Sequence, residues 1–180
     1  MRAWANEALP LASGVRWAII PARGGSKGVL RKCLRTVGDI PLLTRTITAA
    51  ANADSVDDVF VNTDDSEFRE VALAAGAQVP FLRPPELATD TATGVDVVDH
   101  FLRHMFDHQG VLPETVVLIQ PTAPFVLPSD IDGAHALLSG NVDAVCSVCE
   151  SEVKPDWLRR CNDDGYLQPV YPLDTPAHTP

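Results

Sequence analysis

The sequence predicts an α/β fold built around a largely parallel β-sheet. Short apolar runs alternate along the chain with amphipathic stretches of helical period, and this order indicates parallel strands joined by crossover helices. The chain has 180 residues, which is enough for one domain with its own core and too few for two ordinary ones. The alternation predicts five strands and four helices.

Each predicted strand is a short apolar run bounded by proline, glycine or polar residues. The first run ends at Pro21 and a glycine-rich loop, and the run over 116–120 is strongly β-branched and stops at Pro121. The predicted strands cover residues 17–20, 59–62, 79–82, 116–120 and 143–149.

The predicted helices are indicated by apolar residues three or four positions apart. Val97, Phe101 and Met105 share one such face. Pro41 suits the first turn of a helix, and Gly76 suits the left-handed residue that follows a helix end. We expect one helix to begin at Pro41 and the others to cover residues 67–75, 93–108 and 128–138.

Shifts in composition divide the chain into three parts. We expect an N-terminal extension over 1–14, the α/β domain over 15–150, and a different kind of segment over 151–180. Five prolines and scattered polar residues in that last segment predict an extended arm or hairpin that needs a partner surface.

The charge balance argues against nucleic acid as a partner. Acidic residues outnumber basic ones by 24 to 14, for a net charge of −10, and such a chain repels a polyanion. No apolar run approaches the ~20 residues of a membrane helix, and the N-terminus makes a poor secretory signal, so we expect a cytoplasmic protein without membrane contact. Five of the fourteen bases nevertheless fall within thirteen residues, and this concentration favours binding of a small anion. These bases are Arg23, Lys27, Arg31, Lys32 and Arg35.

The four cysteines show no spacing typical of a disulfide framework. Cys146 and Cys149 fall on the strand predicted over 143–149, where positions three apart face opposite sides of a sheet. We therefore interpret them as core residues rather than as metal ligands or a redox pair.

The loop over 21–28 combines glycines and bases at the carboxyl end of a predicted strand, where ligands bind in open α/β sheets. Gly24 and Gly25 allow backbone amides to approach phosphate oxygens, and Arg23 and Lys27 supply charge. The spacing fits neither the P-loop nor the dinucleotide-binding turn. From the residues alone, a phosphate site and a plain glycine-rich turn both remain open.

The segment IIPARGGSKGVLRK is similar to the opening motif of the acylneuraminate cytidylyltransferases, also called CMP-N-acetylneuraminic acid synthetases. The similarity continues, in the family's order and spacing, through VNTDDSEFREVALAAGAQVPFLRPPELATDTAT, LIQPTAP and DAVCSVCES. Together these blocks span about residues 17–154. The family's N-G-x-x-Y strand and metal-binding aspartates have no counterpart here, so we expect a C-terminally shortened relative.

The resemblance implies a three-layer Rossmann-like nucleotidyltransferase fold, that of the nucleotide-diphospho-sugar transferases. It also implies transfer of CMP from CTP to a sialic or related nonulosonic acid with release of pyrophosphate. Mg²⁺ is the implied cofactor, with its ligands in this chain unassigned, and a homodimer is the implied assembly, with 151–180 as the start of a dimerisation or acceptor region.

Carried over by position, the resemblance assigns roles to eleven residues. Arg23 and Lys32 correspond to the positively charged catalytic residues. Gln120 and Lys154 correspond to positions near the acceptor. Nucleotide-binding positions are Ala22, Gly24, Gly25, Lys27, Cys33, Arg83, Ala92 and Gln120. Two of the family's residues are replaced, because Cys33 stands where Asn is usual and Val126 where Arg is usual.

Two alternative functions remain open beside CMP transfer to an acidic sugar. One is a non-catalytic or partner-completed nucleotide-binding remnant of the family, which Cys33 and Val126 favour and Arg23 and Lys32 oppose. The other is a cytidylyltransferase acting on a phosphonate.

Two further clusters have a plain structural interpretation. His100, His104 and His108 recur every four residues, which we interpret as a solvated helix face rather than a metal site. Asp65 is predicted to cap the following helix, while cap and ligand both remain open for Asp64.

Overall fold

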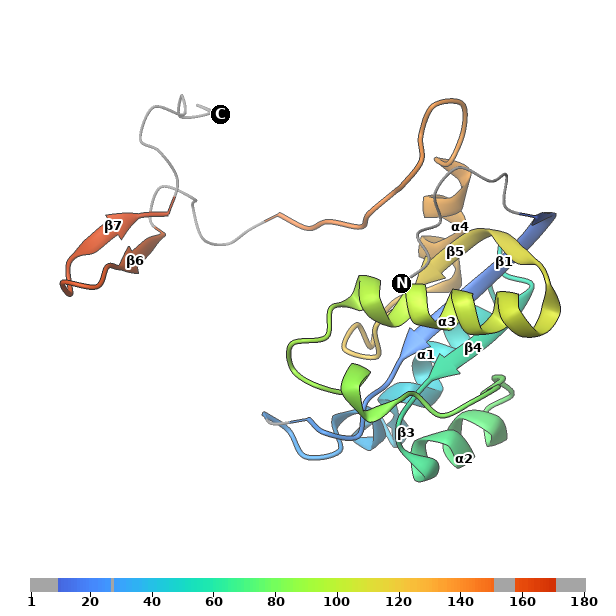
Figure 1. The fold of residues 1–180 in the computed structure, drawn as a ribbon, viewed down its shortest axis with the longest axis horizontal. Coiled ribbons are helices and arrows are strands. Elements are labelled where there is room, and N and C mark those ends of the chain that lie inside the picture. The colour runs from blue at the N-terminus through green and yellow to red at the C-terminus, as the bar shows by residue number, and fades with distance from the viewer. Residues whose placement is uncertain (1–9, 27, 151–157, 171–180) are drawn as a thin grey trace. The chain divides into compact units, whose positions relative to one another are not determined.

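The computed structural model describes residues 10–26, 28–150 and 158–170 (Figure 1). The described residues fall into two compact units that divide between Val145 and Cys146. The first unit holds the sheet and all the described helices, and the second holds one small hairpin.

The sheet of the first unit has three parallel strands in the order β4-β1-β5. Their bounds are Asp58–Asn62 for β4, Leu11–Pro21 for β1 and Leu112–Leu118 for β5. In the central strand, Ile19 lies opposite Phe60 on one side and Leu118 on the other. β1 also includes residues 11–14, which the sequence assigned to an N-terminal extension, because Leu11 and Ala12 pair with the start of β5.

In the described part of the chain, four α-helices pack on the two faces of the sheet, so that the sheet is the middle of three layers. They are α1 (Leu42–Ala51), α2 (Ser66–Ala74), α3 (Gly94–Gln109) and α4 (Pro128–Ala136). Two single-turn 3₁₀ segments, η1 (Lys32–Leu34) and η2 (Pro85–Leu87), and the two-residue strands β2 (Thr36–Val37) and β3 (Ile40–Pro41) lie in the connections. No helix in the described part of the chain is long and apolar enough to cross a membrane.

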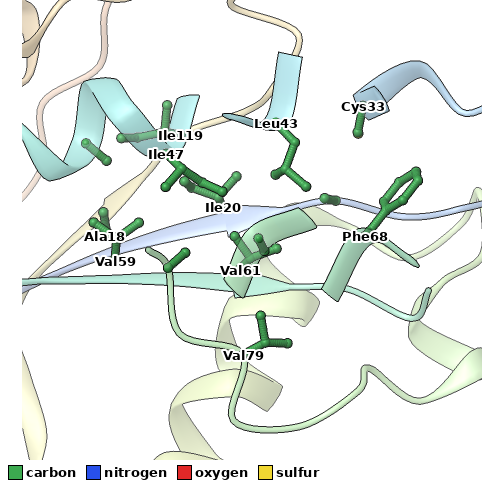
Figure 2. Packing of buried hydrophobic residues seen from close by; sticks show 14 of the residues in the cluster. Ala18, Ile20, Cys33, Leu43, Ile47, Val59, Val61, Phe68, Val79 and Ile119 are labelled. Atoms are coloured by element: carbon green, nitrogen blue, oxygen red, sulfur yellow. The ribbon is translucent and has the colours of Figure 1, made fainter. Parts of the chain in front are cut away.

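The strand period of two decides which side chains pack in each layer. Ala18 and Ile20 lie under α1, α2 and α4, in a cluster that includes Leu43, Ile47 and Phe68 (Figure 2). The alternate residues of β1 point the other way, and Trp17 and Ile19 pack with Phe60 against α3 through Phe101 and Met105. The predicted α/β architecture with a parallel sheet is therefore confirmed.

Side-chain caps account for the starts of two helices. The Asp65 carboxylate accepts hydrogen bonds from the backbone N–H groups of Glu67 (2.9 Å) and Phe68 (3.1 Å), so it caps α2 as predicted. Thr93 and Asp96 form a reciprocal capping box at the start of α3. The helix expected to begin at Pro41 begins at Leu42, with Pro41 as its N-cap, and the one expected over 128–138 ends at Ala136.

The strand predicted over 79–82 is wrong. Only isolated bridges join this segment to the edge of the sheet, between Gln78 and Phe60 and between Leu82 and Thr63. Between these contacts lies Pro80, which has no N–H to donate, so a continuous ladder is not formed.

The strand predicted over 143–149 is also wrong, and so is the interpretation of its cysteines as core residues. The segment pairs with no strand in the described part of the chain, and Cys146 and Cys149 are exposed. A β-branched run becomes a buried strand only where another strand supplies hydrogen-bond partners and a helix covers its face. The sheet consequently has three strands instead of five.

The second unit contains an antiparallel hairpin of β6 (Arg159–Cys161) and β7 (Leu167–Pro169), in which Arg160 lies opposite Gln168. Its turn is closed by the Asn162 side chain, which accepts a hydrogen bond from the Tyr166 N–H at 2.8 Å. Gly165 adopts the left-handed conformation that this turn requires (φ 84°).

Candidate functional site

A cavity of about 350 Å³ opens beyond the carboxyl ends of β1 and β5, where ligands bind in open α/β sheets. Its walls come from the loop after β1, from η1, from the residues around the start of α3 and from the loop after β5. The lining residues are Pro21, Arg23, Ser26, Gly28, Lys32, Cys33, Arg83, Ala92, Thr93, Gly94, Val97, Gln120, Pro121 and Thr122.

The cavity brings together six of the eleven residues that the sequence assigned to the site. They are Arg23, Lys32, Cys33, Arg83, Ala92 and Gln120. Ala22, Gly24 and Gly25 belong to the same loop but do not line the cavity. Lys27 and Lys154 lie outside the described residues.

Gly24 lies against the two aspartates that follow β4. Its N–H donates to Asp64 Oδ1 at 3.0 Å, so the contact of Asp64, which the sequence left open, is to the loop. A Cβ at this position would lie 2.7 Å from Asp65 Oδ2, which explains why a glycine is needed here. Since Asp64 occupies the Gly24 amide, this amide is not aimed at a phosphate in the present structure.

Arg83 is a buried cation on the cavity wall, with 5% of its surface exposed. Its Nε donates to Asn62 Oδ1 at 2.6 Å, its Nη2 to the Asn62 carbonyl, and its Nη1 to the Leu87 carbonyl at 3.5 Å. Burial lowers the pKa of the guanidinium, the nearby Asp64 carboxylate acts in the opposite direction, and Arg23 adds to the lowering. Arginine nevertheless stays charged in proteins, so Arg83 presents a desolvated positive charge held by neutral oxygens.

Arg31 holds the end of the basic loop against α2, a role that the sequence reasoning missed. Its guanidinium bonds both Asp65 oxygens (3.1 and 3.2 Å) and Glu67 Oε2 (2.7 Å), and it lies 4.9 Å from the centre of the Phe68 ring. Its backbone is left-handed (φ 52°), which is uncommon for a residue other than glycine. These contacts fix the residue immediately before Lys32, and they therefore position that lysine at the cavity.

Cys33 is a core residue that also reaches the cavity wall. Burial raises the pKa of its thiol, outweighing the opposite effects of Lys32 and Arg83, so the thiol is neutral at neutral pH. A neutral thiol is a poor hydrogen-bond partner for a polar ligand.

The remaining walls supply polar groups of modest strength. The Ala92 N–H donates to Thr89 Oγ1 at 3.3 Å, and Thr122 Oγ1 donates to Gln120 Oε1 at 3.3 Å. Thr93 and Gly94 place the N-terminus of the 16-residue helix α3 at the cavity, which favours negative charge there. The periodicity that located this helix did not reveal that its first turn belongs to the site.

The histidines of α3 are only partly a solvated face, which corrects the interpretation from the sequence. His100 and His104 pack on Phe81, with ring centroids 5.6 and 3.8 Å from it, and His108 stacks on His104 at 4.1 Å. Among the described residues, no three His, Cys, Asp or Glu side chains are grouped so that they could hold a metal ion. The ligands of the Mg²⁺ that the resemblance implies stay unassigned.

Comparison with known proteins identifies a family. The family model described as "Cytidylyltransferase" matches residues 17–154. The chain is 37% identical over 150 residues to CMP-N,N'-diacetyllegionaminic acid synthase of Legionella pneumophila, covering 83% of this chain and 64% of the relative. It is 38% identical over 151 residues to N-acylneuraminate cytidylyltransferase of Streptococcus agalactiae, covering 82% of this chain and 35% of the relative.

A solved structure shows the same fold. The structure of CMP:2-keto-3-deoxy-manno-octonic acid synthetase complexed with CTP superposes with a TM-score of 0.56 at 21% identity, covering 68% of this chain and 46% of that one. The predicted nucleotidyltransferase fold is thereby confirmed. The chain spans between about a third and two thirds of the length of the two curated relatives. On the match over residues 17–154 and the identity to these relatives, the chain belongs to the cytidylyltransferase family.

Proposed function

We propose that this chain binds CTP in the described cavity and transfers CMP to an acidic sugar of the nonulosonic acid class. The observation that carries the proposal is the charge of the cavity. Arg23, Lys32 and Arg83 line it together, although the chain as a whole has a net charge of −10. Such a concentration of cations fits a triphosphate.

The chemistry needs little covalent participation from the protein. The hydroxyl oxygen of the sugar forms a bond to the α-phosphorus of CTP, and the bond from that phosphorus to the bridging oxygen of the β-phosphate breaks. Pyrophosphate leaves with the electron pair, and the hydroxyl proton passes to solvent. Positioning and neutralisation of the growing charge are then the main contributions of the protein.

The site residues divide these tasks in the proposal. Arg23 and Lys32 bind the triphosphate and stabilise the leaving pyrophosphate. Arg83 and the backbone near Ala92 read the cytosine edge, while Gln120 and Lys154 serve the acceptor. Mg²⁺ and a homodimer enter the proposal through the family resemblance.

The proposal is tested by pyrophosphate release from CTP and Mg²⁺ in the presence of a panel of sialic, other nonulosonic and phosphonic acids. We expect release that requires both CTP and a nonulosonic acid. Arg23→Ala should lower kcat/KM by about a hundredfold or more, because one preorganised charge at a reacting phosphate contributes on this scale. Arg69→Ala, at an exposed arginine of α2, is the matched control and should keep the wild-type rate.

Two results would contradict the proposal. One is silence with every acid while a full-length family member is active under the same conditions. The other is an Arg23→Ala variant that keeps the wild-type rate. Release that requires a phosphonic acid instead would keep CTP as donor and reassign the acceptor.

A further inference from the structure

Asn62 joins two parts of the cavity wall that are distant in the sequence. It is the last residue of β4 and is 1% exposed. Its backbone carbonyl accepts hydrogen bonds from the Ala22 N–H at 3.0 Å, where the loop after β1 begins, and from Arg83 Nη2. Its side-chain Oδ1 accepts from Arg83 Nε at 2.6 Å.

The two contacts between Asn62 and Arg83 fix the plane of the guanidinium. They use different nitrogens of the arginine and different oxygens of one residue, so the planar group cannot turn without breaking one of them. A guanidinium has five N–H donors, and the third contact goes from Nη1 to Leu87. One N–H on each of Nη1 and Nη2 is left over, and Arg83 lines the cavity.

The choice of asparagine has a cost that an ordinary core residue would avoid. Because Oδ1 must face the Nε–H of Arg83, the Nδ2 amide points the other way, and it is buried without a described partner. An unpaired buried donor is destabilising. The compensation is that a neutral amide orients Arg83 without cancelling its charge, which an aspartate at this position would do.

We propose that Asn62 is a positioning residue that makes the cavity select cytosine over uracil, by holding Arg83 in the orientation that reads the base. This inference rests on the proposed function. Cytosine presents two neighbouring acceptors, O2 and N3, whereas N3 of uracil carries a proton and is a donor. The remaining N–H groups of a fixed guanidinium match the two acceptors of the cytosine edge and oppose the uracil N3–H, whereas a guanidinium that can turn could donate to a uracil carbonyl instead.

The test is the ratio of the dissociation constants for CTP and UTP, measured by titration calorimetry without any acceptor. We expect the wild type to prefer CTP, and Asn62→Ser to lower this preference about tenfold, since one oriented hydrogen bond is lost. Serine is too short to reach Nε, so the Nε–H of Arg83 loses its partner, and the orphan amide is removed as well. These two effects on stability oppose each other, and a cooperative melting transition shows that the variant is folded. Asn62→Ala should lower the preference for CTP equally. Arg83→Lys, made separately in the wild type, should also lower it, because lysine lacks the planar fork of donors.

Asn52→Ala is the matched control. Asn52 also uses its amide in one hydrogen bond, to the Thr48 carbonyl at 2.8 Å, but it lies exposed at the end of α1. This variant should keep the wild-type ratio. Folded Asn62→Ser with an unchanged ratio would overturn the inference, as would a wild type that binds both nucleotides equally.

The outcomes separate this inference from the proposed function. A wild type that prefers CTP, loses the preference on Asn62→Ser, and releases no pyrophosphate with any acid would support the inference and contradict the proposed transfer. Pyrophosphate release by the wild type, together with an unchanged ratio of dissociation constants in Asn62→Ser, would support the proposed transfer and contradict the inference about Asn62.

Discussion

The Arg23 guanidinium lies 2.6 Å from the Asp90 carboxylate, which belongs to the segment leading into α3. Both side chains are partly exposed, at 33% and 40%. The cation that we assign to the triphosphate is therefore engaged by a carboxylate at the edge of the cavity. In the proposed function, the triphosphate competes with this carboxylate for Arg23.

Asp90→Asn should therefore strengthen binding of CTP. Because partly exposed ion pairs contribute at most about 1 kcal/mol, we expect the KM for CTP to fall by about two- to fivefold. The same charge change at the exposed Asp107, near the other end of α3, is the control and should leave KM unchanged. An increase in KM on Asp90→Asn would mean that Asp90 holds Arg23 in its binding position.

Gly24→Ala should destabilise the protein by about 1–3 kcal/mol, as overpacking commonly does. The new Cβ would lie 2.7 Å from Asp65 Oδ2, and Asp65 cannot give way freely because it caps α2 and pairs with Arg31. Gly25→Ala is the control, since its Cβ would meet nothing within 4 Å and the change should stay within about 0.5 kcal/mol. Equal free energies of unfolding for the two variants, measured in urea, would contradict this account of the loop.

Stability should decrease as the pH falls through the range in which histidine titrates. Burial, followed by the neighbouring His108 and His100, lowers the pKa of His104 from its ordinary value near 6.5, and Asp107 opposes the shift. The unfolded chain then binds a proton more readily than the folded one, so this contribution is fully present above about pH 6.5 and is lost as the pH falls through the lowered pKa.

The measurement is the melting temperature at about pH 7.5 and about pH 5.5. His104→Phe, which keeps an aromatic ring against Phe81, should show a smaller decrease than the wild type. An equal decrease in both proteins would assign the dependence to other groups.

Cys33→Asn should lower the KM for CTP about threefold, the scale of one neutral hydrogen bond. The neutral, buried thiol offers little to a nucleotide, whereas an amide both donates and accepts. Cys161→Asn, at an exposed position of the hairpin, is the control. An unchanged KM for Cys33→Asn would show that the cavity has adapted to the thiol.

Periodicity and end signals predicted the elements that depend on local sequence. The apolar run over residues 17–20 predicted the last part of β1, and Asp65 caps α2 as predicted. The run over 143–149 has the same strand-like composition, but strand pairing depends on chain segments far away in the sequence. That information is not contained in the run itself.

The site was predicted only in outline, because the sequence shows which residues are close along the chain and does not show which distant residues are in contact. The basic residues of the loop after β1 lie close together in the sequence and could be recognised there, and six assigned residues do line one cavity. The contacts that orient them join distant positions: Arg31 to Asp65, Arg83 to Asn62 and Gly24 to Asp64. Nothing in the local pattern around either member of a pair indicates the other.

The central claim is that the cavity beside Arg23, Lys32 and Arg83 is the CTP site, and a crystal structure of the chain with CTP tests it most directly. The account predicts the triphosphate within hydrogen-bond distance of Arg23 and Lys32, with Asp90 released, and the cytosine edge against Arg83. CTP bound away from this cavity, or with its base beside Arg23 and its phosphates beside Arg83, would contradict it.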